Sequence, residues 1–158
     1  MAPVAADAVP EPYHGLLVGD HDMTPVLAAF HRQPIHLRVI ERETEGNAYT
    51  RLVVLTAGKD ARPVEFGAIV IDLTPFPADA RTAVLDGVEP LGTILATYKI
   101  DHLSRPRAFI RVTSNPFINE HLGLTGDHEL YGRRNVLTTL DHQVFADIVE
   151  ILPVLTSS

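Results

Sequence analysis

The sequence predicts an α+β domain in which an antiparallel sheet of about six strands is flanked by short helices, gathered mainly on one side. Three observations predict this class. β-Branched and aliphatic runs follow one another in pairs joined by short turn segments, which is typical of hairpins. Short helical segments fall between these pairs and do not alternate with single strands. No Gly-x-Gly-x-x-Gly sequence is present, which disfavours a parallel nucleotide-binding sheet.

Length and composition predict one globular domain. The chain has 158 residues, of which 46% are hydrophobic, enough for a sizeable core. Residues 1–12 contain three prolines among small residues and are expected to form a flexible N-terminal tail. Residues 13–158 are then the single folded domain. We leave open whether it is a monomer or a small homo-oligomer.

Charge and cysteine content exclude several classes of function. A formal net charge of −7 disfavours a nucleic-acid surface, so an anionic ligand must be held by a few arginines. The absence of cysteine excludes disulfides, thiol catalysis and cysteine-based zinc sites, and fits a reducing compartment. The N-terminus does not resemble a signal peptide, and no segment is long enough to span a membrane. We therefore expect a cytoplasmic protein with no nucleic-acid or membrane partner.

The first half of the chain reads as a helix followed by three strands. Thr24 can cap a helix whose first turn contains Pro25 and which ends before Pro34. Gly67 indicates a bulge or a close approach of backbone. The strands, each bounded by turn residues, are expected at 35–43, 49–56 and 64–72.

The second half adds short helices and three more strands. Pro90 opens one helix and places Leu91 at its N-terminus, where free N–H groups favour an anion. Ser114 or Asn115 can cap another that begins at Pro116. The helices are expected at 78–85, 91–98 and 116–122, and the strands at 108–113, 130–137 and 144–152.

Glu150 is the first candidate functional residue. In a strand it shares one face with Ala146, Ile148 and Leu152, all apolar. A carboxylate desolvated in this way pairs with a cation or has a raised pKa, and both situations are concentrated at functional sites. The alternative is an edge strand on which Glu150 points to water.

Arg51 is the complementary candidate. Its strand places it on the same face as Tyr49, Val53 and Leu55. An arginine in apolar surroundings can hold a ligand carboxylate through two hydrogen bonds. The alternative is an internal salt bridge to Glu150 or Asp72.

Other polar residues are weaker candidates. Arg133 and Arg134 must point to opposite faces of a strand, so at most one of them faces a cavity. The eight histidines match no standard ligand spacing, and no metal site is expected. No serine lies in a nucleophile elbow, which disfavours a Ser-His-Asp hydrolase.

Four stretches of the sequence, in matching order, resemble the chorismate pyruvate-lyases and their chorismate lyase-like relatives. They thread the chain from about residue 16 to residue 153 and are Asp22-Met23-Thr24, Thr50-Arg51-Leu52-Val53-Val54-Leu55, Pro90-Leu91-Gly92, and Tyr131-Gly132-Arg133-Arg134 with the closing glutamate strand. The resemblance implies a six-stranded antiparallel sheet flanked by helices, with a ligand enclosed between sheet and helical flaps. The segment 113–129 is an addition to the family's pattern.

The resemblance also implies an activity. The family cleaves chorismate to 4-hydroxybenzoate and pyruvate without a cofactor or metal. Its carboxylate-binding arginine falls on Arg51 and its flap contacts on Met23 and Leu91. Its glutamate falls on Glu150 or, counted without a bulge, on Val149.

From the same motifs, Gly92 and Arg133 are expected among the ligand contacts, and Arg51 and Glu150 are the expected catalytic residues. The same fold also serves as the effector-binding domain of bacterial transcription regulators, usually fused to a winged helix-turn-helix, which we do not expect ahead of this domain. A small-molecule sensor module, or a pathway cyclase acting on another substrate, is therefore the alternative function.

Overall fold

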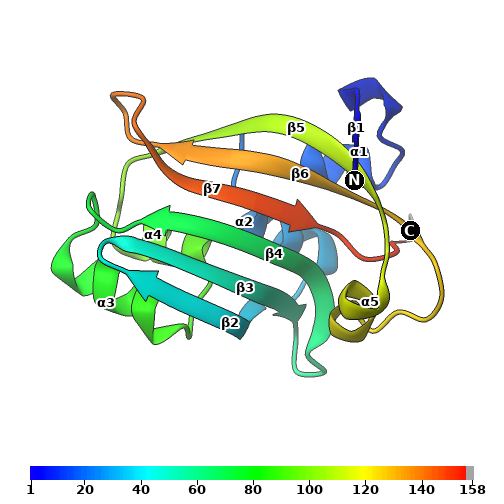
Figure 1. Cartoon of the computed structure of the whole chain (residues 1–158), viewed down its shortest axis with the longest axis horizontal. Helices are drawn as coiled ribbons and strands as arrows, with labels where there is room; N and C mark the ends of the chain where they lie inside the picture. The colour runs from blue at the N-terminus through cyan, green and yellow to red at the C-terminus, as the bar shows by residue number, and fades with distance from the viewer. Residues whose placement is uncertain (156–158) are drawn as a thin grey trace.

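The sheet has seven strands, and every neighbouring pair is antiparallel (Figure 1). The computed structural model describes residues 1–155. Across the sheet the strand order is β1-β5-β6-β7-β4-β3-β2. The strands are β1 (Ala2–Val4), β2 (Ile35–Glu45), β3 (Ala48–Ala57), β4 (Arg62–Asp72), β5 (Leu103–Thr113), β6 (Glu129–Thr138) and β7 (Val144–Ile151). The predicted α+β class with an antiparallel sheet is confirmed, with β1 as the additional strand.

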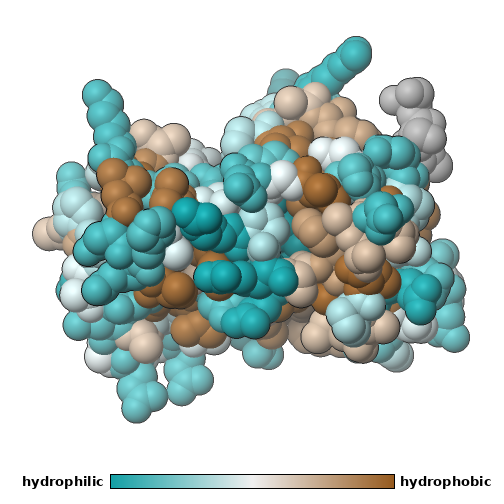
Figure 2. Space-filling view, turned by 90° about the horizontal axis from the view of Figure 1, so that it is seen from above, coloured by the Kyte–Doolittle hydropathy of each residue, from teal (hydrophilic) through white to brown (hydrophobic). Residues whose placement is uncertain are grey.

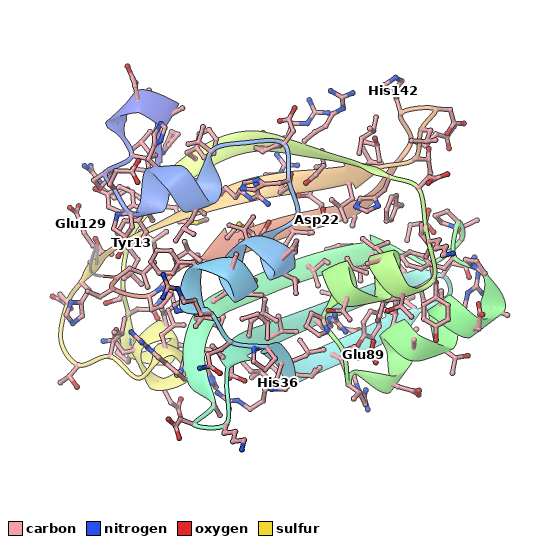
Figure 3. All side chains as sticks on the ribbon, turned by 180° about the vertical axis from the view of Figure 1, so that it is seen from behind. Tyr13, Asp22, His36, Glu89, Glu129 and His142 are labelled. Carbon is pink, nitrogen blue, oxygen red and sulfur yellow. The ribbon has the colours of Figure 1, made fainter. Side chains whose placement is uncertain are left out.

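Helices cover the two faces of the sheet unequally. α1, α2, α3 and α4 lie over the face that Figure 3 turns to the viewer, whereas α5 lies on the opposite face, against β4 (Figures 1 and 3). Their bounds are α1 (Tyr13–Leu17), α2 (Met23–His31), α3 (Ala78–Asp86), α4 (Leu91–Thr97) and α5 (Pro116–Leu122), with a short 3-10 turn at Ala6–Ala8. The additional segment 113–129 therefore does not form a wall of a cavity beneath α2 and α4.

Three apolar clusters hold these layers together. α3 and α4 pack through Val84 and Ile94 on the strand residues Tyr49 and Ile71. α1 and α2 pack through residues such as Leu27, which is completely buried, on the same face of the sheet. α5 covers part of the outer face in a cluster of its own. The core is thus divided by the sheet, and the larger part lies beneath the first four helices.

The N-terminal segment corrects one prediction. Residues 1–12 were expected to be a flexible tail, but Ala2–Val4 pairs with β5, opposite Phe109 to Arg111. Val9 is only 4% exposed and joins the cluster beneath α1 and α2. The prolines of this segment lie at a sheet edge and in turns, where the missing N–H group costs little.

Two helix starts show where local sequence was sufficient. α5 begins as predicted: the Asn115 side chain accepts a hydrogen bond from the Ile118 N–H, at 2.8 Å, and Pro116 occupies the first turn. α2 begins one residue before the expected cap, so Thr24 lies within the helix and Asp22 flanks it. The Asp22 side chain does not cap the helix because it is bonded to His102 instead.

The face seen from above carries apolar patches separated by hydrophilic side chains (Figure 2). None of the helices in the described part of the chain is long and apolar enough to cross a membrane.

Candidate binding site

The register of the sheet places the candidate residues on the face that the helices cover. Glu150 lies opposite Gly67 on one side and Arg133 on the other, and Gly67 lies opposite Val53. Arg51 is two residues from Val53 and therefore shares its face. β7 is a central strand and Glu150 is 3% exposed, which excludes the edge-strand alternative.

The same register resolves the choice between Glu150 and Val149. Val149 pairs with Ala68 and Arg134. Its side chain points to the opposite face of the sheet from Glu150 and packs against the α5 cluster. Glu150 is thus the residue of this pair that faces the helices.

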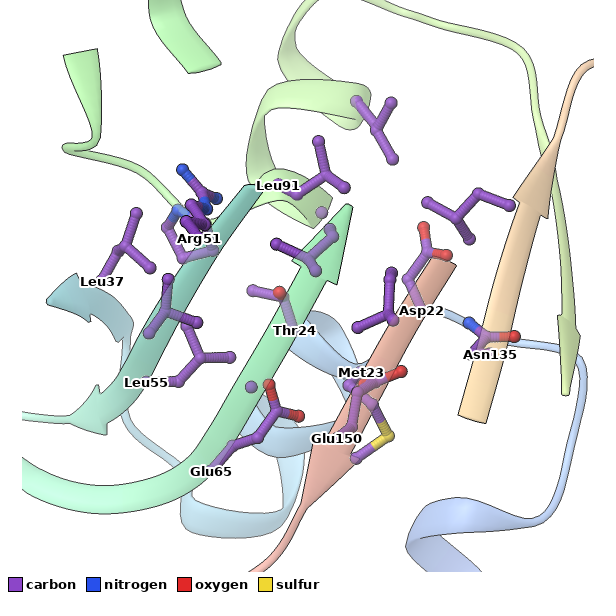
Figure 4. A pocket seen from close by; sticks show the side chains of 18 residues that line it. Asp22, Met23, Thr24, Leu37, Arg51, Leu55, Glu65, Leu91, Asn135 and Glu150 are labelled. Atoms are coloured by element: carbon purple, nitrogen blue, oxygen red, sulfur yellow. The ribbon is translucent and has the colours of Figure 1, made fainter. Parts of the chain in front are cut away.

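A cavity lies between this face and the starts of α2 and α4. It encloses about 560 Å³ of space free of protein atoms, including the open mouth. Arg51 lies on one side of it, near Leu37 and Leu91, whereas Asp22, Asn135 and Glu150 lie on the other (Figure 4). The rest of the wall is mostly aliphatic and includes Met23, Val53, Leu55, Ile69, Leu95, Leu137 and Ile148. A ligand with an apolar body and polar ends suits such walls.

Arg51 is a buried cation without a carboxylate partner. Its side chain is 2% exposed, and its Nη1 donates to the Val84 carbonyl at 3.4 Å. The guanidinium stacks over the Tyr49 ring at 5.7 Å, and its Nε has no partner in the described part of the chain. Burial lowers the pKa of the guanidinium, which nevertheless stays charged at neutral pH. The proposed salt bridges to Glu150 and Asp72 are not formed, because Glu150 pairs with Arg133 and Asp72 accepts from Thr74.

Two buried glutamates meet in the cavity wall. Glu65 and Glu150 are 4% and 3% exposed and are joined by a side-chain hydrogen bond. Burial raises the pKa of Glu65 well above its ordinary value, and the neighbouring Glu150 carboxylate raises it further. Burial also raises the pKa of Glu150, against the opposing effect of the Arg133 cation. We therefore assign the shared proton to Glu65 and the negative charge to Glu150.

Arg133 does not line the cavity, contrary to the expectation that it contacts a ligand. It is completely buried, and its Nε donates to Glu150 Oε1 at 3.2 Å. Its remaining donors reach the Leu17, Gly19 and His21 carbonyls at 3.3, 3.2 and 2.6 Å. Arg133 therefore connects the glutamate pair to the segment between α1 and α2. Arg134 points to the other face, as predicted, and pairs with Asp147 at the surface.

The two helical flaps meet above the cavity. Met23 and Leu91 both line it, as the family resemblance implies. A Cβ atom at Gly92 would lie 2.9 Å from Thr24 Oγ1, so Gly92 lets the starts of α2 and α4 approach closely. Gly67 serves a similar purpose below, where a Cβ atom would lie 3.1 Å from Val53 Cγ2. Its predicted close approach is thus observed, and a side chain there would enter the cavity.

Solved structures with the same architecture include bacterial transcriptional regulators and their ligand-binding or effector domains. The effector domain of PhnF from Mycobacterium smegmatis has a TM-score of 0.64 at 11% identity, over 89% of this chain and 98% of that one. A ligand-binding domain from Bordetella bronchiseptica is described as that of a putative GntR-family transcriptional regulator. It has a TM-score of 0.58 at 13% identity, over 78% of this chain and 91% of that one. A GntR-family transcriptional regulator from Bacillus cereus has a TM-score of 0.54 at 13% identity, over 78% of this chain and 98% of that one.

This chain has the fold of GntR-family effector domains. At these identities the likeness establishes the fold alone. No protein-family model and no curated protein sequence matches the chain. The structural likeness therefore agrees with the chorismate lyase-like fold class but leaves the lyase activity untested.

Sequence reasoning missed three polar residues of the cavity, namely Asp22 as a wall residue, Glu65 and Asn135. A signal for Glu65 was present, because period two places it on the same face as Gly67, Ile69 and Ile71. The same alternation places Asn135 on one face with Arg133 and Leu137 in the predicted strand 130–137. Asp22 gave no such signal, since its place depends on the approach of α2. Within residues 1–155, no group of three or more histidine and carboxylate side chains is arranged to hold a metal ion.

Proposed function

We propose that this protein is a small-molecule-binding module whose cavity takes a carboxylate or similar anion, with Arg51 as the anchor. The observation that carries this proposal is the burial of Arg51 without a carboxylate partner among residues 1–155. An unpaired buried cation is costly, and a bound anion would remove that cost. The regulator effector and ligand-binding domains that share the fold support a binding role.

The hydrogen-bonding capacity of Arg51 specifies the anion. Among residues 1–155, Nη1 donates to the Val84 carbonyl and Nε has no partner, so Nε and the neighbouring Nη2 are available to a ligand. Two neighbouring N–H groups of a guanidinium match the two oxygens of a carboxylate. The aliphatic wall would exclude water from this pair and strengthen it.

Calorimetric titration with benzoate and 4-hydroxybenzoate tests the proposal. Because a hydrogen bond to a charged group contributes about 1.5–3 kcal/mol, we expect Arg51→Gln to weaken binding by roughly 10- to 150-fold. Arg42→Gln is the matched control, since Arg42 lies opposite Arg51 in the register but is exposed and bonded to the Leu85 carbonyl. Equal affinity of the Arg51→Gln variant and the native protein would show that the anion binds elsewhere.

A second candidate function is cleavage of chorismate to 4-hydroxybenzoate and pyruvate. It is favoured by the presence of a carboxyl group, Glu150, and of Arg51 on opposite sides of one cavity with mostly aliphatic walls. Arg51 would position the ring carboxylate, while Glu150 would bind the ring hydroxyl and assist proton transfer. The bond between the ring carbon and the ether oxygen breaks and enolpyruvate leaves with the electron pair. The ring loses a proton and becomes aromatic, enolpyruvate gains a proton to become pyruvate, and no cofactor is required.

Incubation with chorismate, followed by measurement of pyruvate and hydroxybenzoate, distinguishes the two candidates. Turnover that is lost in Arg51→Ala and in Glu150→Gln would establish the lyase. Absence of turnover together with tight hydroxybenzoate binding would establish the binding module.

A further inference from the structure

His102 connects the two helical flaps that meet above the cavity. It follows α4 in the chain, and its ring lies against the residue that precedes α2. The ring Nε2 atom lies 2.7 Å from Asp22 Oδ2, and the Nδ1 atom lies 2.8 Å from the Ile100 carbonyl oxygen. A carboxylate and a carbonyl can only accept, so both ring nitrogens must donate. The ring that makes both bonds is therefore a positively charged imidazolium.

Asp22 belongs to the wall between the cavity and the outside of the molecule. It lines the cavity (Figure 4) and also a surface hollow of about 520 Å³, including its open mouth. The hollow is lined in addition by Asp20, His102, Leu103, Ser104 and Arg105. The side chains of His102 and Asp22 are 17% and 22% exposed. His102 can therefore exchange a proton with solvent, while the change in charge acts on the cavity through Asp22.

Asp22 has the largest effect on the charge of the His102 ring. Its hydrogen bond raises the pKa of His102 above the ordinary value of 6.5, and burial opposes this rise. The Ile100 carbonyl and the nearby Asp101 carboxylate raise the pKa further. Phe145 of β7 meets the ring edge-on at 6.5 Å between centroids and carries no charge. The two other charged members of the hollow have opposite signs.

Four charged side chains line the cavity, namely Arg51, Asp22, Glu65 and Glu150. Glu150 is compensated by Arg133, and Glu65 holds the proton of the glutamate pair. While His102 is protonated, Asp22 is compensated as well. Among residues 1–155, Arg51 is then the charge of this wall that lacks a counter-ion, and it attracts an anion.

Building on the proposed function, we propose that His102 regulates the cavity: its protonated ring compensates Asp22 and lets an anion bind at Arg51, and loss of that proton weakens binding. A neutral imidazole has one N–H group and can keep only one of its two bonds. The Asp22 carboxylate is then uncompensated. It lies across the cavity from Arg51, so its charge opposes the attraction of the arginine and repels an anion (Figure 4).

Neutral hydrogen bonds hold the same region of the fold whatever the charge of His102. Ser104 Oγ donates to the His21 carbonyl at 3.1 Å and accepts from Asn135 Nδ2 at 2.8 Å. These bonds keep the start of β5 beside the residues that precede α2. Loss of the His102 proton should therefore change the charge and the freedom of the Asp22 side chain and leave the sheet and helices intact.

Calorimetric titration with benzoate, which stays an anion from about pH 6 to about pH 9, tests this regulation. The pKa of His102 is raised, so its proton is bound at the lower pH and is lost as the pH rises through that pKa. Over this range we expect the native protein to lose about five-fold or more affinity beyond the loss in His102→Gln, whose side chain is uncharged. Ionisation of Glu65 also weakens binding at high pH, but it acts in both proteins and cancels in the comparison.

Three further measurements separate regulation from a structural role. His128→Gln is the matched control and should behave as the native protein does, since His128 bonds to the Thr125 carbonyl in the segment 113–129, away from the cavity. Asp22→Asn should bind benzoate more tightly than the native protein at about pH 9, because the repelling carboxylate is gone. The pKa of His102, followed by NMR of its ring proton and assigned through His102→Gln, should rise when benzoate is bound, because linkage is reciprocal.

Equal pH dependence in the native protein and in His102→Gln, or a His102 pKa that benzoate leaves unchanged, would exclude the regulation. Weaker binding by Asp22→Asn at about pH 9 would show that Asp22 only supports the fold. Each of these results leaves the proposed function standing if benzoate still binds and Arg51→Gln still weakens it. If benzoate does not bind the native protein even at about pH 6, the proposed function and the regulation by His102 are both excluded.

Discussion

Arg133 and Arg134 are adjacent in β6, and the alternation of the strand gives them opposite environments. Arg133 is enclosed beneath α1 and α2, where it meets Glu150 and three backbone carbonyls. Arg134 is half exposed and bonds to Asp147 on the outer face. Two identical side chains therefore form one buried ion pair, at Arg133, and one exposed ion pair, at Arg134.

Replacement of these two arginines should have very different consequences. Arg133→Met leaves Glu150 as an unpaired buried carboxylate, so we expect a loss of about 3–5 kcal/mol in the free energy of unfolding. Arg134→Met breaks an exposed pair and should change stability little. Urea denaturation of both variants measures the difference. Similar midpoints for the two would contradict the interior role of Arg133.

Gly132 is required by the approach of β7. A Cβ atom at this position would overlap the Glu150 carbonyl oxygen. This oxygen belongs to the backbone of the paired strand β7 and cannot move as a side-chain atom could. We expect Gly132→Ala to cost at least about 2 kcal/mol by thermal denaturation. Gly15→Ala is the control, since its Cβ atom would meet only the far end of the Glu11 side chain. A stable Gly132→Ala variant would show that β6 and β7 can separate locally at low cost.

At the scale of elements, local pattern predicted most strands and helices and failed where distant partners decide. Period two and turn residues located the hairpin of β3 and β4. The Arg51 and Glu150 positions followed from the same alternation. β1 could not be predicted, because three residues with a proline form a strand only when β5 offers an edge. The bond between Asp22 and His102 joins residues 80 positions apart, and no local pattern encodes it.

The contact between α2 and α4 offers a test of how the cavity is closed. Gly92→Ala should push Thr24 away and destabilise the closed arrangement by about 1–2 kcal/mol. Removing the obstructing Oγ1 atom through Thr24→Ala should recover much of that loss in the double variant. A double-mutant cycle of unfolding free energies measures this coupling. Strict additivity would mean that the two helix starts do not touch in solution.

For the whole molecule, the buried glutamate pair makes stability depend on pH. The pKa of Glu65 is raised in the folded state above its ordinary value of 4.5, so the folded protein holds a proton that the unfolded chain has released. The stabilising contribution is complete below that value and is lost as pH rises towards the folded pKa, at up to about 1.4 kcal/mol per pH unit.

Glu65→Gln should remove this dependence. We expect the free energy of unfolding of the variant to decline less between pH 5 and pH 8 than that of the native protein, because glutamine holds no exchangeable charge at this site. Guanidinium denaturation across this range provides the measurement. Parallel curves for the two proteins would show that Glu65 ionises normally in the fold.

The hydrogen bonds that Arg133 donates to the Leu17, Gly19 and His21 carbonyls have a further consequence for how a ligand would enter. They fasten the segment before α2 to the sheet, and the bond between Asp22 and His102 fastens its first turn. α4 is held instead by the packing of Leu91, Ile94 and Leu95 and by backbone bonds within its own turns. The cavity should therefore open on the α4 side, and amide hydrogen–deuterium exchange should be faster in α4 than in α2. A bound ligand would slow amide exchange mainly in α4. The exchange rate of this one helix would then report whether the cavity is occupied.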